Sequence, residues 1–549
     1  MARNSSYGFL FGLIGLFFVG STSAQCPPLQ DPCRCAPSIY EPVAIICENA
    51  GSLSNVLQAI SGARDTPIDS LLIMDTAVTT IPANAFQDFI ILRLVMNRNT
   101  LSQISENAFN GPLLDSLVEL DLTDNQLGQV PQTGIPQLRN LRKLYLNRNR
   151  ITELPPTSFA QFASRDILLK LELAGNRLSD QAMSDSTVFR PLRSLQELSL
   201  ETNALTQIPS AALINEVPVG ALDFPSLTSL SLEFNGITVI IPQAFQGVPN
   251  LQYLYLTGNK FPSWQPEMFR YVNQLRTLGI GETPISVIPS NAFVHTPNLI
   301  RLEMSEAAVD TIERGAFQQT PLIQAIVLNK NRLTVVRADF FQGLNDLYSI
   351  DLQGNRIDTV EPLGFANLPG LRHLDISYNQ LQTMPLNTFD NSFLPIPNDR
   401  RVIFACANPW LCDSRLEWFR QLLRDNLDID IDKPGCVAAC MSSINGCPPQ
   451  GTPLRAIDFC PISDNPLPLT IIMTILMISI CLMALIRYGM SHRRKKLKDQ
   501  EIEDDRIISS AASVYHASAY GPGYAPSAVG VDLDLPAAHT LDDRPNYFM

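Results

Sequence analysis

Leucine and isoleucine recur at fixed spacing along most of the chain, most regularly over residues 251–379. Six consecutive segments start 24 residues apart there and read LQYLYLTGNKF, LRTLGIGETPI, LIRLEMSEAAV, IQAIVLNKNRL, LYSIDLQGNRI and LRHLDISYNQL. Each fits the pattern LxxLxLxxNxL. The apolar positions 4 and 6 alternate with more polar ones, as in a short β-strand with one buried face. The pattern therefore predicts one strand per segment, with positions 3 and 5 facing solvent.

The same pattern extends in both directions and gives thirteen repeats. A unit with a single apolar face becomes stable only by stacking on copies of itself. Ten repeats have asparagine at position 9, where a buried amide can satisfy backbone groups of its own turn and of the neighbouring turn. The repeats begin at Ile68, Ile91, Leu117, Leu141, Leu168, Leu195, Leu227, Leu251, Leu275, Leu299, Ile323, Leu347 and Leu371. The asparagines are Asn99, Asn125, Asn149, Asn176, Asn203, Asn235, Asn259, Asn331, Asn355 and Asn379, and Thr76, Thr283 and Ala307 interrupt the series.

Most repeats also carry a late phenylalanine, which we expect to fill the convex side of the core. These residues are Phe86, Phe109, Phe159, Phe245, Phe293, Phe317 and Phe389. A leucine-rich helical protein would not keep so regular a register. The pattern is identified as the leucine-rich repeat. This resemblance implies an α/β solenoid, a horseshoe with a parallel β-sheet on its concave face.

Ten cysteines lie outside the repeats in two even groups. The ends of a solenoid expose apolar core, and disulfide-bonded caps would cover it in an exported protein. We expect a cap over residues 25–60, repeats over 61–394 and a second cap over 395–464. A zinc site at the later group is the alternative, although no histidine lies nearby. The groups are Cys26, Cys33, Cys35 and Cys47, and then Cys406, Cys412, Cys436, Cys440, Cys447 and Cys460.

Both groups resemble the cysteine-rich flanks of extracellular leucine-rich repeat proteins. The first contains CRC at residues 33–35, and the second contains NPWLCD followed by LEWF, whose aromatic residues should cover the last repeat. The usual Cys-Asp-Cys of the second flank is CDS here, at residues 412–414. We infer that Cys406 takes the role of the missing cysteine. Six cysteines still leave fifteen connectivities open.

Two apolar stretches predict export and membrane anchoring. Residues 1–24 have a basic start, an apolar run and small residues before a cleavage site, as in a secretory signal peptide. A membrane anchor is the alternative, although the apolar run is short for one. Residues 465–486 carry no charge over a length that crosses a bilayer, so they predict a transmembrane helix. Basic residues follow directly, which places residues 487–549 in the cytoplasm as a disordered tail.

Composition and charge narrow the classes of partner. The chain is 45% hydrophobic and 17% charged, ordinary values for a folded protein. Its formal net charge of -13 argues against a nucleic acid partner, which requires a coherent basic surface. The only Asn-x-Ser/Thr motif is at Asn4, in the predicted signal peptide. We therefore expect no N-linked glycan on the solenoid.

No sequence motif supports catalysis or a cofactor. Of the five histidines, only His295 and His373 lie in the predicted ectodomain. Neither is near a serine or cysteine elbow, and the chain has no HExxH and no Gly-Lys pair for a phosphate loop. We expect neither enzyme activity nor a metal or other cofactor.

The solvent-facing strand positions form the candidate binding surface. Curvature brings positions 3, 5, 7 and 8 of successive repeats side by side. Arginine and tyrosine at such positions often anchor protein interfaces. We expect a basic patch over repeats 2 to 4, an acidic patch over repeats 5 to 7 and aromatic residues beside it. The candidates are Arg93, Arg98, Lys143, Tyr145 and Arg148, then Glu172, Glu197, Glu201, Glu233 and Phe234, and finally Tyr253 and Tyr255.

The whole order of segments is similar to that of extracellular leucine-rich repeat transmembrane proteins, such as connectin, chaoptin and Toll receptors. The resemblance implies a single-pass type I protein of the plasma membrane with an extracellular amino terminus. Its expected function is adhesion or recognition, through a protein ligand or the same protein on a neighbouring cell. The alternative is a co-receptor for a soluble ligand in innate immune or growth-factor signalling. Tail tyrosines and the terminal Tyr547–Met549 suggest phosphotyrosine-binding or PDZ partners.

Overall fold

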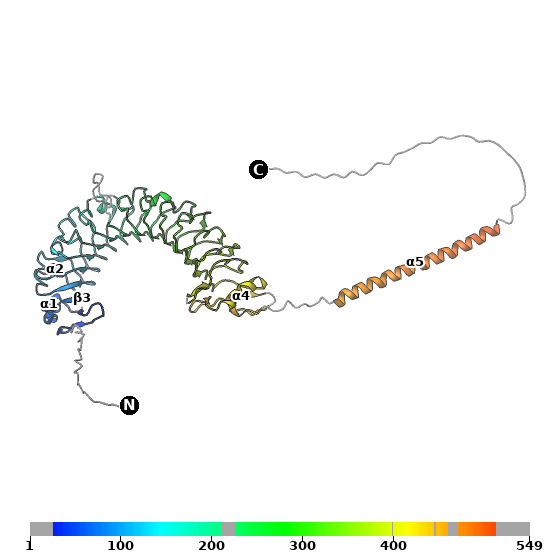
Figure 1. The fold of residues 1–549 in the computed structure, drawn as a ribbon, viewed down its shortest axis with the longest axis horizontal. Coiled ribbons are helices and arrows are strands. Elements are labelled where there is room, and N and C mark those ends of the chain that lie inside the picture. The colour runs from blue at the N-terminus through cyan, green and yellow to red at the C-terminus, as the bar shows by residue number, and fades with distance from the viewer. Residues whose placement is uncertain are drawn as a thin grey trace, which may run out of the picture. The chain divides into compact units, whose positions relative to one another are not determined.

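A computed structural model describes residues 26–185, 187–210, 226–397, 399–443, 446–458 and 469–511. The chain divides into two compact units, Met1–Cys460 and Pro461–Met549. The first unit is an arc of stacked turns (Figure 1). The predicted signal peptide, Cys460 and the tail tyrosines lie outside the described residues, so those expectations remain predictions.

One sheet lines the concave side of the arc (Figure 1). Each of the thirteen predicted repeats contributes one strand, and the two flanks add further strands. All neighbours are parallel except β1 (Cys33–Cys35), which pairs antiparallel with β2. The parallel strands are β2 (Ala44–Glu48), β3 (Ile68–Met74), β5 (Ile91–Val95), β7 (Glu119–Asp121), β8 (Lys143–Tyr145), β9 (Lys170–Glu172), β10 (Glu197–Ser199), β11 (Ser229–Ser231), β12 (Tyr253–Tyr255), β13 (Thr277–Gly279), β15 (Arg301–Glu303), β17 (Ala325–Val327), β19 (Ser349–Asp351), β21 (His373–Asp375), β22 (Arg401–Phe404) and β24 (Ile429–Asp430).

Outside this sheet, the described return segments consist mainly of turns and short elements. A repeat of about 24 residues leaves few positions on the convex side, so long helices do not fit there. The paired short strands are β4 (Thr80–Ile81) with β6 (Gln103–Ile104), β14 (Val287–Ile288) with β16 (Thr311–Ile312), β18 (Val335–Val336) with β20 (Thr359–Val360), and β23 (Leu411–Cys412) with β25 (Ser442–Ser443). Among the described residues of this unit, the helices are α1 (Leu53–Ala59), α2 (Leu113–Ser116) and α4 (Glu417–Asp425), with 3-10 turns η1 (Ser61–Ala63), η2 (Ile135–Gln137), η3 (Asp180–Met183), η4 (Pro266–Phe269), η5 (Ser414–Leu416) and η6 (Leu454–Ala456).

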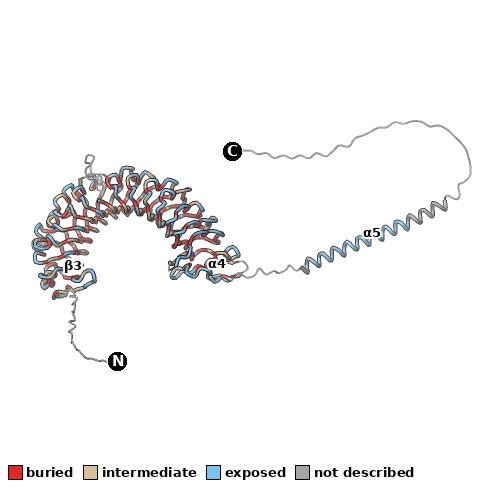
Figure 2. The backbone as a smooth tube through the Cα atoms, in the orientation of Figure 1, coloured by how far each residue is buried: buried red, intermediate tan, exposed pale blue. Residues whose placement is uncertain are grey.

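A single apolar core runs from Cys33 to Ile457 through the whole arc (Figure 2). The late phenylalanines form its convex side, as predicted, and all seven are buried. In the second half, Phe293, Phe317, Phe341, Phe365 and Phe389 stack in line, with neighbouring ring centroids 5.5 to 6.3 Å apart. Each ring therefore packs on the corresponding ring of the next repeat, and the core has no layer boundary along this stretch.

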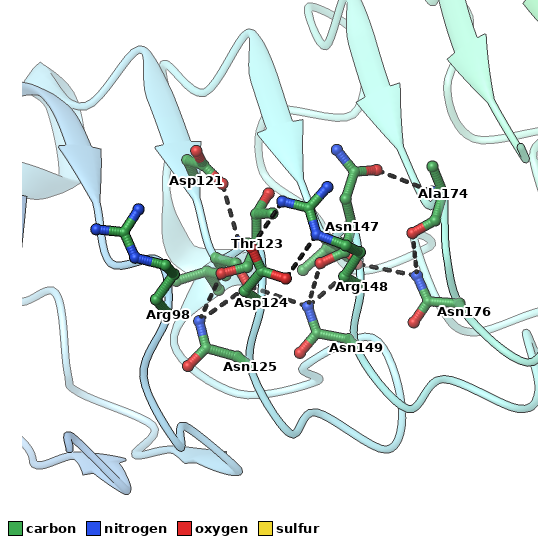
Figure 3. Close-up of polar contacts among 12 residues, drawn as sticks. Arg98, Asp121, Thr123, Asp124, Asn125, Asn147, Arg148, Asn149, Ala174 and Asn176 are labelled. Atoms are coloured by element: carbon green, nitrogen blue, oxygen red, sulfur yellow. Dashed lines mark hydrogen bonds and ion pairs between the residues drawn. The ribbon is translucent and has the colours of Figure 1, made fainter. Parts of the chain in front are cut away.

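The position-9 asparagines tie each turn to the one before it, as expected. Asn149 donates through Nδ2 to the carbonyl oxygens of Leu122 (3.0 Å) and Leu146 (3.1 Å), and its Oδ1 accepts from the Leu127 N–H at 3.0 Å. Asn125 and Asn176 repeat this arrangement on either side (Figure 3). Each amide satisfies buried backbone groups of two successive turns, so the stack has few unpaired polar groups in its interior.

The asparagine series continues into the carboxyl-terminal flank, where the repeat pattern had not been recognised. Asn408 donates to the Ile376 carbonyl at 3.0 Å and accepts from the Leu381 N–H at 3.0 Å. Its signal in the sequence is the spacing of Ile403, Ala405 and Asn408, which matches positions 4, 6 and 9. The NPWLCD motif is thus both the start of the cap and the last turn of the ladder.

Disulfides close both ends of the arc. Cys26 bonds to Cys35 and Cys33 to Cys47 at the amino end, while Cys406 bonds to Cys436 and Cys412 to Cys440 at the carboxyl end. Cys447 is also disulfide-bonded. These bonds fix part of the connectivity that the sequence left open. Cys436 and Cys440, the residues at which zinc was the main alternative, are both disulfide-bonded. Cys406 does take part in the cap, as inferred.

Aromatic residues of the LEWF segment cover the last turns, as the resemblance implied. The Trp418 indole donates to the Met384 carbonyl at 2.9 Å, and Phe419 is buried against Phe389 and Trp410. The helix α4 carries Trp418 and Phe419, so its apolar side replaces the next repeat. This arrangement keeps the end of the core out of water.

The second unit contains the helix α5 (Leu469–Ala511), in which Met473–Asp499 is long and apolar enough to cross a membrane. Its described apolar side chains, such as Leu485, are exposed with no protein packed on them. The helix continues past Ile486, so the expectation of disorder is wrong for residues 487–511. This stretch is rich in Lys, Arg and Glu, which favour helices, and it contains no proline.

The amide ladder makes a direct prediction about stability. Replacing Asn149 by alanine removes the partners of Leu122, Leu146 and Leu127 backbone groups, and each buried group left unpaired costs about 1–3 kcal/mol. We expect Asn149→Ala to lower the free energy of unfolding by at least that amount in denaturant titrations. Asn345→Ala, at an exposed asparagine, is the control and should change it by less than about 0.5 kcal/mol. Equal effects of the two substitutions would contradict the role of the ladder.

Candidate functional site

Solvent-facing strand residues form straight columns across the concave sheet. The parallel register places Lys143 directly between Glu119 and Lys170, and it places Tyr253 beside Thr277. Positions that are about 24 residues apart in sequence are therefore neighbours in space. This confirms the expected grouping of side chains by repeat position.

The basic side chains of repeats 2 to 4 do not form the expected basic patch. Arg93 pairs with Glu41 at 3.1 Å and with Glu119 at 2.8 Å, and Lys143 pairs with the same Glu119 at 3.3 Å. Tyr145 lies under the Lys170 ammonium, 5.7 Å from the ring centroid. The basic patch does not form because Glu119, in the repeat between Arg93 and Lys143, neutralises both cations. The surface is consequently a neutral network of paired charges.

A second paired series runs along position 8. Asp75, Arg98, Asp124 and Arg148 alternate in sign, and Arg98 lies 2.8 Å from Asp75. Arg148 lies 2.6 Å from Asp124 (Figure 3). The Arg98 guanidinium lowers the pKa of Asp75, and the Arg148 guanidinium lowers the pKa of Asp124. All four residues have a positive φ between 47° and 57°, because the chain turns sharply just before the position-9 residue of each repeat. We call these four residues the charge ladder.

Some position-8 side chains lie over a glycine in the next repeat. Arg148 covers Gly175, Phe234 covers Gly258, and the Gly258 φ is 75°. A Cβ atom at Gly258 would clash with the Phe234 ring. The missing side chain lets the Phe234 ring pack against the turn that follows β12, where it remains 44% exposed. The position of this aromatic group thus depends on a glycine in the following turn.

Repeats 6 to 8 present carboxylates and aromatic rings together. Glu201 and Glu233 have no ion-pair partner among the described residues, in contrast to Glu172 and Glu197, which share Lys170. All four acids line a hollow of about 260 Å³. We call Glu201, Glu233, Phe234, Tyr253 and Tyr255 the acidic–aromatic shelf.

Electrostatics distinguish this shelf from the rest of the concave face. Burial raises the pKa of Glu233, and the nearby carboxylates of Glu201 and Glu303 raise it further. Burial also raises the pKa of Tyr255. Negative charge therefore accumulates here without an internal counter-ion, and this favours a cationic group from outside.

The predicted site residues thus separate into two groups. Glu201, Glu233 and Tyr255 line one hollow, and Phe234 and Tyr253 lie in the same repeats as exposed aromatic residues of the shelf. Arg93, Arg98, Lys143, Tyr145 and Arg148 are engaged in internal contacts, and burial next to Glu119 raises the pKa of Tyr145 to about 12. The residues that contact this second group, and that the sequence did not single out, include Asp75, Glu119, Asp124 and Lys170. Each lies at position 3 or 8 of its own repeat.

The carboxyl-terminal cap also reaches into the concave face, which the repeat pattern could not predict. Lys433 forms an ion pair with Asp375, donates to Gln353 Oε1 at 2.5 Å and lies 5.3 Å from the Phe404 ring centroid. Burial raises the pKa of Asp351, with the nearby charge of Asp375 adding to the effect. Lys433 therefore neutralises part of the negative charge at this end of the sheet.

The histidines have structural contacts. His295 Nε2 lies 3.1 Å from Glu267, and His373 Nδ1 lies 3.3 Å from the Ser349 hydroxyl oxygen. In the part of the chain that the structure describes, no three His, Cys, Asp or Glu residues are grouped so as to hold a metal ion.

Comparison with known proteins agrees with this architecture. The leucine rich repeat family model matches residues 115–178, 225–285, 273–333 and 321–381. Keratocan of Bos taurus is 30% identical over 229 residues, which are 42% of this chain and 58% of keratocan. Podocan-like protein 1 of Mus musculus is 32% identical over 200 residues, or 36% of this chain and 32% of that protein. A solved leucine-rich repeat protein of Leptospira interrogans has a similar fold, with a TM-score of 0.50, 23% identity and coverage of 68% and 98%.

The glycine beneath Phe234 can be tested by substitution. Gly258→Ala adds a Cβ at a positive φ, and this Cβ also pushes the Phe234 ring away from the turn. Gly435→Ala is a matched control, because its φ of 77° is similar but nothing lies within 4 Å of the new Cβ. We expect both to lower the melting temperature, with Gly258→Ala costing about 1–3 kcal/mol more through the clash. Equal losses would show that Phe234 moves freely.

The uncompensated charge of the shelf predicts a pH-dependent effect. Because the folded pKa of Glu233 is raised, ionised Glu233 opposes folding at neutral pH, and this cost disappears as pH falls through that pKa. We therefore expect Glu233→Gln to raise the melting temperature at pH 7, with a gain that shrinks toward pH 4. Glu197→Gln instead breaks the ion pair with Lys170 and should give no gain. A gain of constant size at all pH values would contradict this account.

Proposed function

Because this chain belongs to the leucine-rich repeat proteins, whose stacked repeats offer long binding surfaces, we propose that it is a cell-surface adhesion or recognition receptor. Its solenoid binds a protein through the concave face and has no catalytic role. The apolar helix α5 anchors it in the plasma membrane as a single-pass type I protein. The solenoid then faces the outside of the cell, where disulfides persist.

The acidic–aromatic shelf is the observation that carries this proposal. Tyr255 lines the same hollow as Glu201 and Glu233, which have no ion-pair partner in the described chain. Phe234, which follows Glu233 directly, and Tyr253 on the strand of Tyr255 are 44% and 39% exposed. Aromatic side chains with few rotatable bonds are frequent anchors of protein interfaces. A partner with a basic residue next to an apolar one would fit this combination.

The remainder of the amino-terminal concave face is less suited to that role. Breaking the Arg98–Asp75 or Arg148–Asp124 pair to bind a partner would cost an interaction that is already formed. Glu201 and Glu233 have no such interaction to lose. This contrast favours the shelf over the charge ladder as the centre of the interface.

The rigidity of the shelf supports the same conclusion. Tyr253 and Tyr255 lie on the central strand β12, with β11 and β13 paired on either side. Phe234 packs against Gly258. The backbone that carries these side chains is fixed by the sheet, so binding requires little backbone ordering.

Aggregation of cells that express the full-length protein would test the proposal. Non-adherent cells carrying it should cluster, with each other or with labelled non-expressing cells. The double variant Tyr253→Ala/Tyr255→Ala should weaken this contact about 30-fold or more, the effect of losing about 2 kcal/mol at an interface anchor. The control is Asp75→Asn/Arg98→Gln, which removes a paired charge outside the shelf and should leave clustering unchanged.

Two results would argue against this function. Cells that stay dispersed despite confirmed surface display would refute adhesion and favour a co-receptor for a soluble ligand. Clustering that survives the double tyrosine variant would refute the shelf as the contact surface.

A further inference from the structure

The tip of the amino-terminal hairpin exposes two neighbouring apolar side chains. Ile39 and Tyr40 lie between β1 and β2 and are 94% and 92% exposed. No other large apolar side chain among the described residues is as exposed, and the next, Leu427, reaches 78%. We call residues 37–42 the knob. Such exposure in a folded segment usually marks a contact surface.

The knob is held in one position. The Ser38 N–H donates to the Glu41 carbonyl at 2.9 Å, and the Glu41 N–H donates to Ser38 Oγ at 2.9 Å. The Glu41 carboxylate accepts from Ser70 Oγ and from Arg93 Nη1, each at 3.1 Å. Pro37 and Pro42 restrict the backbone on both sides. Because Ser70 and Arg93 are concave-face residues of β3 and β5, the knob stands over the amino end of the concave face.

A groove lies near the opposite end of the same face. It has a volume of about 620 Å³ and crosses β15, β17, β19, β21 and β22. Ala325 and Ser349 occupy position 3 here, where earlier strands carry Lys143, Lys170 or Tyr253, and their small side chains leave the space open. Its lining residues are Ile300, Arg301, Gln324, Ala325, Tyr348, Ser349, Arg372, His373, Arg400 and Val402.

The groove and the knob have complementary chemistry. Ile300, Ala325 and Val402 give the groove an apolar lining that suits the Ile39 side chain. Arg301 and Arg400 can stack on the Tyr40 ring. Arg301 and Arg400 already pair with Glu303 and Asp430, and the Glu41 carboxylate of the knob already pairs with Arg93. The match therefore rests on apolar contact and ring stacking. A volume of this size accommodates two neighbouring side chains.

From these features we infer that the partner, within the proposed adhesion function, is a second copy of this chain in antiparallel orientation. The knob of each copy enters the groove of the other. Because knob and groove lie at opposite ends of one face, a twofold axis generates two identical contacts and a closed pair. The carboxyl ends of the two solenoids then lie at opposite ends of the pair, as contact between two cells requires. The absence of N-glycosylation motifs after Asn4 leaves both surfaces bare.

Disulfide trapping between two cell populations tests this inference on the full-length chain. One population displays Tyr40→Cys and the other Ser349→Cys, both with Cys481→Ser, since Cys481 is the free cysteine of the described chain. Tyr40 is on the surface and serine is close to cysteine in size, so both variants should fold. Mixing under mild oxidation should give a product of twice the chain mass that disappears on reduction. Neither population alone should give it, because the pairing never brings two copies of one site together.

The matched control replaces Ser349→Cys by Leu427→Cys, at an exposed apolar residue outside the groove. It should give no product with Tyr40→Cys. Absence of product from Tyr40→Cys and Ser349→Cys, both confirmed at the surface, would overturn the inference, as would equal trapping by the control. Ile39→Ser/Tyr40→Ser should also reduce clustering at least tenfold, and unchanged clustering would count against the knob.

The two proposals fail in different ways. If clustering depends on Tyr253 and Tyr255 but no trapped pair forms, the receptor function stands with a different partner and the knob-in-groove pair is refuted. If the trapped pair forms while the tyrosine double variant clusters normally, the pair is correct and the shelf is not its contact surface.

Discussion

Burial of the turn that follows each strand is the constraint on which the whole structure depends. Every turn carries backbone N–H and carbonyl groups that the next turn covers, and unpaired groups there would be costly. The position-9 asparagine resolves this because one amide both donates and accepts, as Asn149 does toward Leu122 and Leu127. The requirement recurs in almost every repeat, so the period of the chain and the stacking of its turns have the same origin.

The concave face follows from this stacking. Once the asparagines fix the distance and register between turns, every strand pairs in parallel with its neighbours, and solvent-facing side chains line up by repeat position. The charge ladder follows position 8, and the acidic–aromatic shelf draws on positions 3, 5, 7 and 8 of later repeats. Opposite charges in neighbouring repeats cancel, whereas Glu201 and Glu233 adjoin tyrosine, phenylalanine and other acids. The balance between internal pairing and unpaired charge is therefore what separates a structural column from a candidate interface.

The ends of the stack require a different solution, since no further repeat covers them. At the carboxyl end, Asn408 completes the ladder, α4 covers the last turns, and disulfides hold the following loop. That loop also brings Lys433 onto the concave sheet. At the amino end, the first hairpin closes the core and places Ile39 and Tyr40 in solvent. The caps thus do more than exclude water, because each one adds functional groups to the rim of the concave face.

The sequence by itself determined the solenoid, the thirteen strands, the buried asparagines and phenylalanines, and the presence of cysteine-rich ends. These features are local and repeated, so a single period is enough to reveal them. It also placed the five shelf residues at solvent-facing repeat positions, on strand β12 for Tyr253 and Tyr255 and in the turns that follow the strands for the others, since repeat position is a local property. Only the tertiary structure decided which charges are neutralised, because Glu41 reaches Arg93 across 52 positions and Lys433 reaches Gln353 across 80. The same holds for the disulfide pairs, for the extension of the asparagine ladder to Asn408, and for the placement of knob and groove at opposite ends of one face. These features depend on contacts between distant segments, which no local pattern encodes.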